Sequence, residues 1–262
     1  MKFLSDRALE RLRRAAELPD LSGTHYRLLE RVAAGGMGTV YAAEDTKLGR
    51  RIALKVLDAP DASGELARRL LREARVLAQL EHPGIVPVHD VGTLADGRVF
   101  YTMKFVAGQR LDEHLARTPS LADRLRLFLR ICEPVAFAHA HGVLHRDLKP
   151  ANIMIGPFGE VLVLDWGLAK IIRDDQGNDS ASAAPRDPDL TVFDPAPVPS
   201  GSDTSTGFSA TTAHGAVLGT PGYMSPEQSR GEVEKLDERS DVYSLGAILE
   251  VLTKGNNKVP PA

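Results

Sequence analysis

The chain has 262 residues, of which 43% are hydrophobic and 26% are charged, and its formal net charge at pH 7 is -3. These fractions are ordinary for a folded protein and argue against disorder throughout. A slightly acidic chain is a poor match for nucleic-acid-binding proteins, which usually carry a basic surface. No apolar run approaches the length of a membrane span and the N-terminus lacks a signal peptide, so we expect no membrane segment and a cytoplasmic location.

The elements expected along the chain divide it into a sheet-rich part and a helical part. Residues 1–24 are predicted to form an N-terminal helical extension, with a short capped helix that ends at Pro19. Extended segments are expected at residues 25–32, 39–43, 51–57, 86–91 and 98–106, and helices at residues 64–80, 122–141 and 241–252. The prediction is an α+β chain with a sheet lobe over 25–106 and a mainly helical lobe over 107–262.

Two segments of the second lobe have unusual compositions. Residues 174–216 are rich in Ser, Thr, Asp, Pro, Gly and Ala and hold few large apolar side chains, so they cannot offset the entropy cost of ordering. We predict a disordered insert there. The helix expected at 241–252 is apolar on most faces, which predicts full burial.

A glycine cluster lies between the first two extended segments, in the run from Ala33 to Val40. Glycines allow a backbone hairpin to approach phosphate groups and to point N–H groups at them. A cluster of this kind also fits an ordinary turn, so by itself it decides little.

Two charged residues occupy positions where apolar residues are expected. Lys55 interrupts the apolar run 52–57, and Glu73 shares the apolar stripe of the next helix with Leu70 and Leu77. A charge on an inward face is costly unless it is paired, which favours an ion pair between the two. The alternative is that both side chains extend to solvent.

Two short polar loops follow apolar strands further along the chain. The first runs from His145 to Asn152 and the second from Asp165 to Gly167. Together they supply two carboxylates, an amide and a lysine, which can place a proton acceptor beside a hard-cation site, as phosphoryl transfer from a magnesium nucleotide requires. Either loop alone also fits an ordinary polar turn. The occurrence of both loops in this order, after Lys55 and Glu73, favours phosphoryl transfer.

At these residues the chain resembles the protein-kinase family, in its bacterial (eukaryotic-like, Hanks-type) serine/threonine branch, over residues 25 to about 254. The resemblance implies a bilobal fold with ATP and Mg²⁺ as cofactors. The chain departs from the family pattern at Ala33, where the family has a glycine, and at Trp166, where the family usually has a phenylalanine. The nucleotide contacts that it implies are Val32, Gly35, Gly36, Gly38, Val40, Ala53, Lys55, Met103, Lys104, Val106 and Met154.

The resemblance also implies the roles of the polar residues. Asp147 would accept the proton of the substrate hydroxyl, and Lys149 would neutralise part of the charge on the phosphoryl group in transfer. Lys55 would hold the α- and β-phosphates with Glu73 as its partner, and the Mg²⁺ ligands would be Asn152 and Asp165. His145 resembles a core residue of the family and is not expected to act as a base.

The substrate class and the regulation are implied by neighbouring residues. Lys149 after Asp147, and the Gly219-Thr220-Pro221 run, resemble serine/threonine kinases, with Thr220 bonding Asp147. Because Arg146 precedes Asp147, the resemblance implies control by phosphorylation between Asp165 and Glu227. The candidate sites are Ser209, Thr211 and Thr212. The alternative is that the insert is a solvated linker without a regulatory role.

The helical lobe of the family normally continues beyond the helix at 241–252, so we expect a truncated lobe. Glu227 is then expected to lack its arginine partner, and the apolar residues Leu245, Ile248 and Leu252 to form an exposed patch. Asp241 is expected to brace the catalytic loop from below.

Two functions are carried forward. The first is an ATP-dependent kinase that transfers the γ-phosphoryl group to Ser/Thr hydroxyls of protein substrates, with autophosphorylation or dimerisation left open. The second is a catalytically weak or inactive nucleotide-binding pseudokinase or scaffold fragment. A metabolite kinase is disfavoured by the Ser225-Pro226-Glu227 run, which suits a polypeptide substrate.

Overall fold

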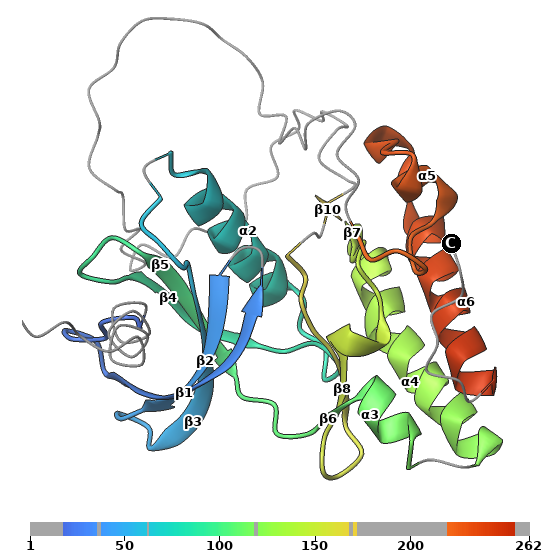
Figure 1. Cartoon of the computed structure of the whole chain (residues 1–262), viewed down its shortest axis with the longest axis horizontal. Coiled ribbons are helices and arrows are strands. Elements are labelled where there is room, and N and C mark those ends of the chain that lie inside the picture. The colour runs from blue at the N-terminus through green and yellow to red at the C-terminus, as the bar shows by residue number, and fades with distance from the viewer. Residues whose placement is uncertain are drawn as a thin grey trace, which may run out of the picture.

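The computed structural model describes residues 18–35, 38–61, 63–117, 120–167, 170–171 and 219–254. These residues form an α+β fold of two bodies, with the sheet on the left and the helices on the right in Figure 1. The predicted N-terminal helix, apart from Leu18, lies outside the described residues, as do Gly36, the insert at 174–216 and the candidate phosphorylation sites within it.

The first body is an antiparallel five-stranded sheet with the strand order β1-β2-β3-β5-β4. All five extended segments expected from the sequence are present, with ends shifted by a few residues. Their bounds are β1 Tyr26–Gly35, β2 Gly38–Asp45, β3 Arg50–Val56, β4 Val88–Thr93 and β5 Val99–Lys104. The inner strands are the buried ones: on β3, Ile52 through Val56 are all buried.

One long helix, α2 (Glu65–Gln79), packs against β4 and β5 of this sheet. Its buried face carries Leu70, Ala74 and Leu77, at the helical spacing that the sequence predicted, and includes Glu73. The helix therefore turns one carboxylate inward among apolar side chains, toward the strands beneath it.

The second body consists of helices around two long antiparallel ones. The helices are α3 Leu111–Leu115, α4 Leu121–Ala140, α5 Pro226–Ser229 and α6 Glu238–Lys254, with short 3-10 turns at Pro150–Asn152 and Val233–Lys235. Short strands form two small sheets, β6-β8-β9 and β10-β7. Their bounds are β6 Gln109–Arg110, β7 Val143–Leu144, β8 Ile153–Ile155, β9 Val161–Val163 and β10 Lys170–Ile171. None of the described helices is long and apolar enough to cross a lipid bilayer.

A single apolar cluster connects the two bodies. It includes Leu70 and Leu77 of α2 together with Ile131 of α4, Val163 of β9 and Trp166. Trp166 is only 1% exposed, so the indole at the position of the family's phenylalanine is accommodated in the core. This shared core holds α2 of the first body against α4, β9 and Trp166 of the second body.

The burial of α6 differs from both predictions made for this helix. Leu245, Ile248 and Leu252 are buried because α6 packs antiparallel to α4 with these residues in the shared core, so the predicted exposed patch at these three positions is wrong. The prediction that the helix is fully buried is wrong as well, because Val242 is 56% exposed and Tyr243 is 49% exposed on its outer side.

Candidate active site

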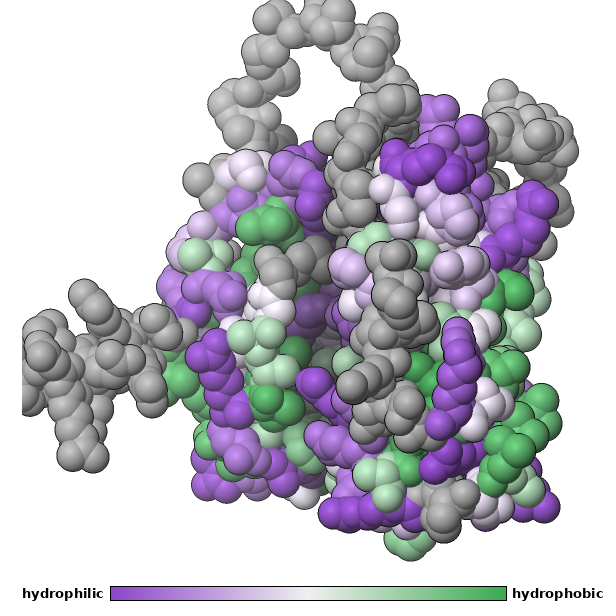
Figure 2. All heavy atoms as spheres, turned by 45° about the vertical axis from the view of Figure 1, so that its right-hand side comes forward, coloured by the Kyte–Doolittle hydropathy of each residue, from purple (hydrophilic) through white to green (hydrophobic). Residues whose placement is uncertain are grey.

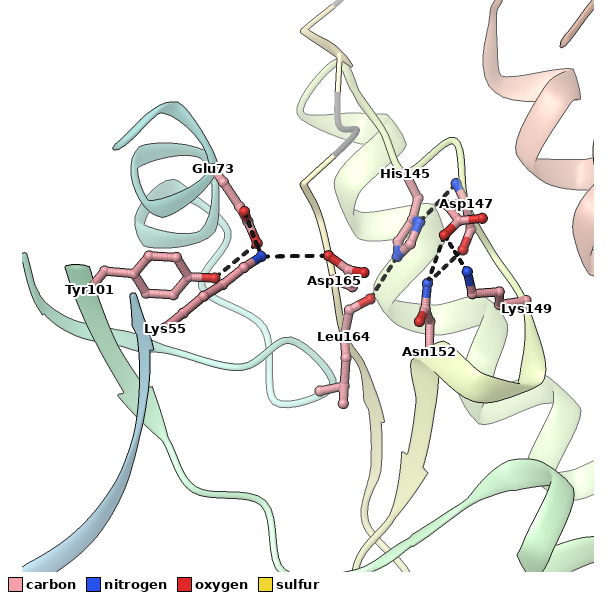
Figure 3. A network of polar contacts seen from close by, with 9 residues as sticks. All are labelled: Lys55, Glu73, Tyr101, His145, Asp147, Lys149, Asn152, Leu164 and Asp165. Carbon is pink, nitrogen blue, oxygen red and sulfur yellow. Dashed lines mark hydrogen bonds and ion pairs between the residues drawn. The ribbon is translucent and has the colours of Figure 1, made fainter. Parts of the chain in front are cut away.

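Lys55 of β3 and Glu73 of α2 form a buried ion pair. The Lys55 Nζ lies 2.7 and 2.8 Å from the two carboxylate oxygens of Glu73, and both residues are largely excluded from solvent. The predicted pairing is therefore confirmed, and the alternative of two side chains extended to solvent is wrong. The Lys55 Nζ also lies 3.7 Å from the Asp165 Oδ1, which places Lys55 at the junction of the two bodies (Figure 3).

Tyr101 of β5 joins this pair, a contact that the sequence analysis did not anticipate. Its hydroxyl donates a hydrogen bond of 2.8 Å to the Glu73 Oε1, and Figure 3 shows it approaching Glu73 beside the Lys55 side chain. The signal was present in the sequence: a tyrosine in an apolar strand has a polar end that needs a partner when it is buried. Its partner depends on strand pairing that the sequence pattern does not specify.

Asp147 is held by residues from three places in the chain. Thr220 donates its hydroxyl to the Asp147 Oδ1 at 2.8 Å, as expected from the sequence. Lys149 donates to the Oδ2 at 2.6 Å and to the Thr220 Oγ1 at 2.7 Å. The Asn152 amide donates to the Asp147 backbone carbonyl at 2.9 Å and to the Oδ2 at 3.2 Å. The carboxylate therefore has one defined orientation.

The loop that carries Asp147 is fastened from below by Asp241 of α6. The two carboxylate oxygens of Asp241 accept hydrogen bonds of 2.8 Å from the backbone N–H groups of His145 and Arg146. Arg146 has a φ of 71°, in the left-handed region that costs a non-glycine residue about 1–3 kcal/mol. The expected bracing by Asp241 is present, and it offsets the cost of this backbone conformation.

His139 of α4 supports Asp241 in turn, and the sequence analysis missed it. Its Nε2 lies 2.8 Å from the Asp241 Oδ2. Burial raises the pKa of Asp241, but the hydrogen bond from His139, the nearby His145 and two backbone N–H groups together lower it below its ordinary value of 3.8. Asp241 is therefore ionised near neutral pH, although it is fully buried.

His145 occupies the core position expected from the sequence. It is fully buried and packs at 4.6 Å, between ring centroids, from Trp166. Its Nε2 lies 2.9 Å from the Leu164 carbonyl and its Nδ1 accepts the Asp147 N–H at 3.2 Å. Since both ring nitrogens are used to connect the two polar loops, the ring positions Asp147 and Asp165 relative to each other.

Arg146, whose position next to Asp147 implied control by phosphorylation, is buried. Burial lowers the pKa of Arg146, Asp241 raises it and the nearby Arg72 lowers it. Within the described residues the Arg146 Nε has no hydrogen-bond partner. Gln228 of α5, a second contact missed from the sequence, donates to the Arg146 carbonyl at 2.7 Å. A buried guanidinium with one N–H group that has no described partner therefore lies next to Asp147.

The surface is hollowed between the sheet body on the left and the helical body on the right of Figure 2. Of the apolar candidates for nucleotide contact, Met103 packs against the apolar cluster that connects the two bodies. Ala53 and Met103 are directly paired between β3 and β5. Val40, Met103, Val106 and Met154 are half-buried, Ala53 is buried, and Val32, Gly35 and Lys104 are exposed. The Lys104 N–H is donated to the Pro87 carbonyl at 3.1 Å.

Gly38 meets a packing requirement within the glycine cluster. Its φ is 145°, and a Cβ placed on it would lie 2.2 Å from the Val56 carbonyl oxygen of β3. Any side chain would therefore push β2 away from β3. Gly35, paired with Gly38 at the end of the hairpin, has more space, with its nearest contact at 3.7 Å.

Glu227 has a local partner in the part of the chain that the structure describes. The Ser240 hydroxyl donates to its Oε1 at 2.8 Å. The preceding Ser225 caps α5 in a reciprocal arrangement with Gln228. The Ser240 hydroxyl therefore fastens the segment after Thr220 to α6. The sequence had predicted that Glu227 would lack its arginine partner.

Comparison with known proteins agrees with this geometry. Residues 26–186, more than half of the chain, match the protein kinase domain family. The chain belongs to the protein kinase family. The bilobal α+β fold and the paired Lys55 and Glu73 are what the resemblance of its sequence implied.

The similar curated relatives are bacterial proteins. The chain is 38% identical over 243 residues to the serine/threonine-protein kinase PknD of Protochlamydia amoebophila, covering 86% of this chain and 22% of that protein. It is 38% identical over 245 residues to PknD of Chlamydia trachomatis serovar L2b and 37% identical over 238 residues to PknD of Chlamydia caviae. The chain therefore spans about a quarter of the length of the curated relatives it matches.

Proposed function

We propose that this chain is an ATP-dependent serine/threonine kinase domain that transfers the γ-phosphoryl group of ATP to hydroxyl groups of protein substrates. The observation that carries the proposal is the position of Lys55. It is paired with Glu73 in one body and lies 3.7 Å from Asp165 of the other. A cation that can bind phosphates therefore lies close to a carboxylate that can bind a metal ion, at the junction of the two bodies.

Asp147 is the proposed proton acceptor. The hydroxyl oxygen of the substrate attacks the γ-phosphorus, its proton passes to the Asp147 carboxylate, and the bond from the γ-phosphorus to the bridging oxygen breaks to release ADP. Contacts with Thr220, Lys149 and Asn152 hold the carboxylate in place before the substrate arrives. A base positioned in this way contributes about two to four orders of magnitude in rate.

Lys149 is proposed to stabilise the phosphoryl group during transfer. Its ammonium group already lies between Asp147 and Thr220, and its side chain is 23% exposed, so solvent still reaches it. The charge on the phosphoryl group is spread over its oxygens in the transition state, where a fixed cation acts most strongly. Lysine serves here as a point charge.

Asn152 and Asp165 form a donor set that fits Mg²⁺. Asp165 offers a carboxylate that is 52% exposed, and the Asn152 NH₂ is used by Asp147, which turns the amide oxygen toward another partner. Magnesium prefers such hard oxygens and takes few of them from the protein. When bound, the ion would neutralise charge on the phosphates of ATP.

The nucleotide is proposed to occupy the hollow between the bodies. Lys55 would contact the α- and β-phosphates beneath the hairpin that carries Gly35, Gly36 and Gly38. The base would lie between Val32, Val40 and Ala53 on the sheet side and Met154 on the other, with Met103 at the rear. Backbone groups of Lys104 and Val106 would bond its polar edge; the Lys104 N–H is already donated to Pro87, so at Lys104 this would be the carbonyl.

The proposal is tested by incubating the chain with γ-labelled ATP, Mg²⁺ and a generic basic protein. We expect label on serine and threonine residues and none on tyrosine. The reason is that Lys149 and Thr220 resemble the residues found next to the substrate in the serine/threonine branch. Adding EDTA should reduce labelling to background, and excess Mg²⁺ should restore it. Binding of ATP without any transfer would instead support the nucleotide-binding pseudokinase or scaffold.

A regulatory phosphorylation is proposed between residues 174 and 220. A phosphate carried by this segment would find the buried Arg146 and the nearby Arg72; burial and Arg72 both lower the pKa of Arg146. We expect mass spectrometry after incubation with ATP and Mg²⁺ to find phosphate in this segment, with Ser209, Thr211 and Thr212 as candidates. If the segment stays unmodified while a basic protein is labelled, self-phosphorylation here is wrong.

A further inference from the structure

Tyr101 forms a third contact with the ion pair at the junction of the bodies. Strand pairing puts Tyr101 of β5 directly opposite Lys55 of β3, so the two side chains share one face of the sheet. The helix α2 packs against β5, and its Glu73 extends toward these two side chains (Figure 3). The tyrosine hydroxyl and the lysine ammonium therefore reach the same carboxylate from neighbouring strands.

The two donors, Lys55 and Tyr101, share the carboxylate of Glu73. Lys55 contacts both oxygens of Glu73, at 2.7 and 2.8 Å, and the Tyr101 hydroxyl donates to the Oε1 at 2.8 Å. The Lys55 Nζ also lies 5.9 Å from the centre of the Tyr101 ring. A lysine alone can rotate about a carboxylate, but a second donor on one oxygen limits the positions that Glu73 can adopt.

The environment makes this hydrogen bond a strong one. Tyr101 is 2% exposed and Glu73 is 3% exposed, so little water competes for either group. Burial and the neighbouring Glu73 raise the pKa of Tyr101 well above its ordinary value, so the hydroxyl stays protonated and remains a donor. A hydrogen bond to an ionised acceptor is about twice as strong as one between neutral groups.

We propose that Tyr101 is a positioning residue of the phosphate-binding site, which fixes Glu73 and through it both Lys55 and the helix α2. Its effect on turnover depends on the proposed kinase function, whereas its effect on α2 does not. Because Tyr101 belongs to the sheet and Glu73 to the helix, the bond fastens α2 in the orientation that keeps Lys55 toward Asp165, without a nucleotide.

The test replaces Tyr101 by Phe, which removes the hydroxyl and keeps the ring. We expect kcat/KM for magnesium ATP to fall about tenfold, while KM for the protein substrate stays the same. The matched control is Tyr26→Phe, since Tyr26 of the same sheet is also buried and also donates to a carboxylate, Asp90, at 2.8 Å. The control should leave both constants unchanged.

Coupling to Glu73 separates positioning from simple packing. In a Glu73→Ala background the acceptor of the hydroxyl is absent, so adding Tyr101→Phe should change kcat/KM by less than about twofold. An equal fall in both backgrounds would overturn the proposal, because the hydroxyl would then act independently of Glu73.

Hydrogen exchange tests the same inference without any catalysis. In the nucleotide-free chain, amides of α2 should exchange several times faster in Tyr101→Phe than in the native chain or in Tyr26→Phe, whereas those of α4 should not change. If the native chain transfers no phosphate, the proposed function fails and the exchange result still decides the role of Tyr101. Exchange of α2 at the native rate in Tyr101→Phe would overturn it.

Discussion

Replacing Asp147 by Asn is expected to slow phosphoryl transfer by about two to four orders of magnitude while ATP binds as before. The amide has the shape of the carboxylate but cannot accept the proton of the substrate hydroxyl. Nucleotide affinity should persist because Asp147 is bonded to Thr220, Lys149 and Asn152 and has no contact with the Lys55 and Glu73 pair. The measurement is single-turnover transfer beside titration with a fluorescent ATP analogue.

The control for this change is Asp123→Asn on α4. Asp123 pairs with Arg126 at the surface, where its side chain is 56% exposed, so transfer should proceed at the native rate. Equal labelling by native chain and Asp147→Asn would reject Asp147 as the base. A loss of nucleotide affinity in Asp147→Asn would show that the loop, and with it the interpretation of the rate, had been disturbed.

Replacing Asp241 by Ala is expected to destabilise the protein by about 3–5 kcal/mol and to abolish transfer. The change removes the acceptor for the N–H groups of His145 and Arg146, in a site that is fully buried. Arg146 then loses what holds its left-handed backbone, and the adjacent Asp147 loses its place. Denaturant unfolding at pH 7 measures the loss of stability.

The pH dependence of this stabilisation has a definite sign. The pKa of Asp241 in the folded protein lies below its ordinary value of 3.8, so the ionised carboxylate binds fewer protons than in the unfolded chain. Its contribution is fully present above that ordinary value and is lost as the pH falls through the lower, folded pKa. The difference between native chain and Asp241→Ala should therefore be constant from pH 5 to 7 and shrink below about pH 4.

A surface carboxylate provides the comparison for the Asp241 measurement. Asp123→Ala should leave the midpoint of unfolding almost unchanged at every pH, because an exposed pair such as Asp123 and Arg126 contributes little. If Asp241→Ala destabilised the protein as little as Asp123→Ala, the two backbone hydrogen bonds would not be what fastens the loop that carries Asp147. A difference that grows toward acid pH would contradict the lowered pKa.

The ion pair could be predicted from the sequence because its reason is local. A lysine in an apolar strand and a glutamate on the apolar stripe of a helix are both read from short-range periodicity, and burial leaves them little choice but to pair. The two polar loops, and the order in which they follow apolar strands, can likewise be read directly from the sequence. Their assignment to a base and to metal ligands came from the resemblance of Asp147, Asn152 and Asp165 to a family pattern.

The burial of α6 shows where periodicity stops being informative. Its sequence is apolar on several faces, which predicted full burial, and it was also expected to expose Leu245 and Ile248. Which face is covered depends on α4, a helix about a hundred positions earlier that packs antiparallel to it. No local pattern contains that pairing, so Val242 and Tyr243 could not be identified as the exposed side.

The sequence by itself determined the class of fold, the strands and helices that carry the polar residues, and the inward positions of Lys55 and Glu73, because these depend on spacing within single elements. Only the tertiary structure decided that Tyr101 reaches Glu73 and that His139 reaches Asp241. Both contacts join elements whose register and relative orientation are set by the packing of the whole core. A hydrogen bond depends on fractions of an ångström, and that precision arises only when distant segments pack together.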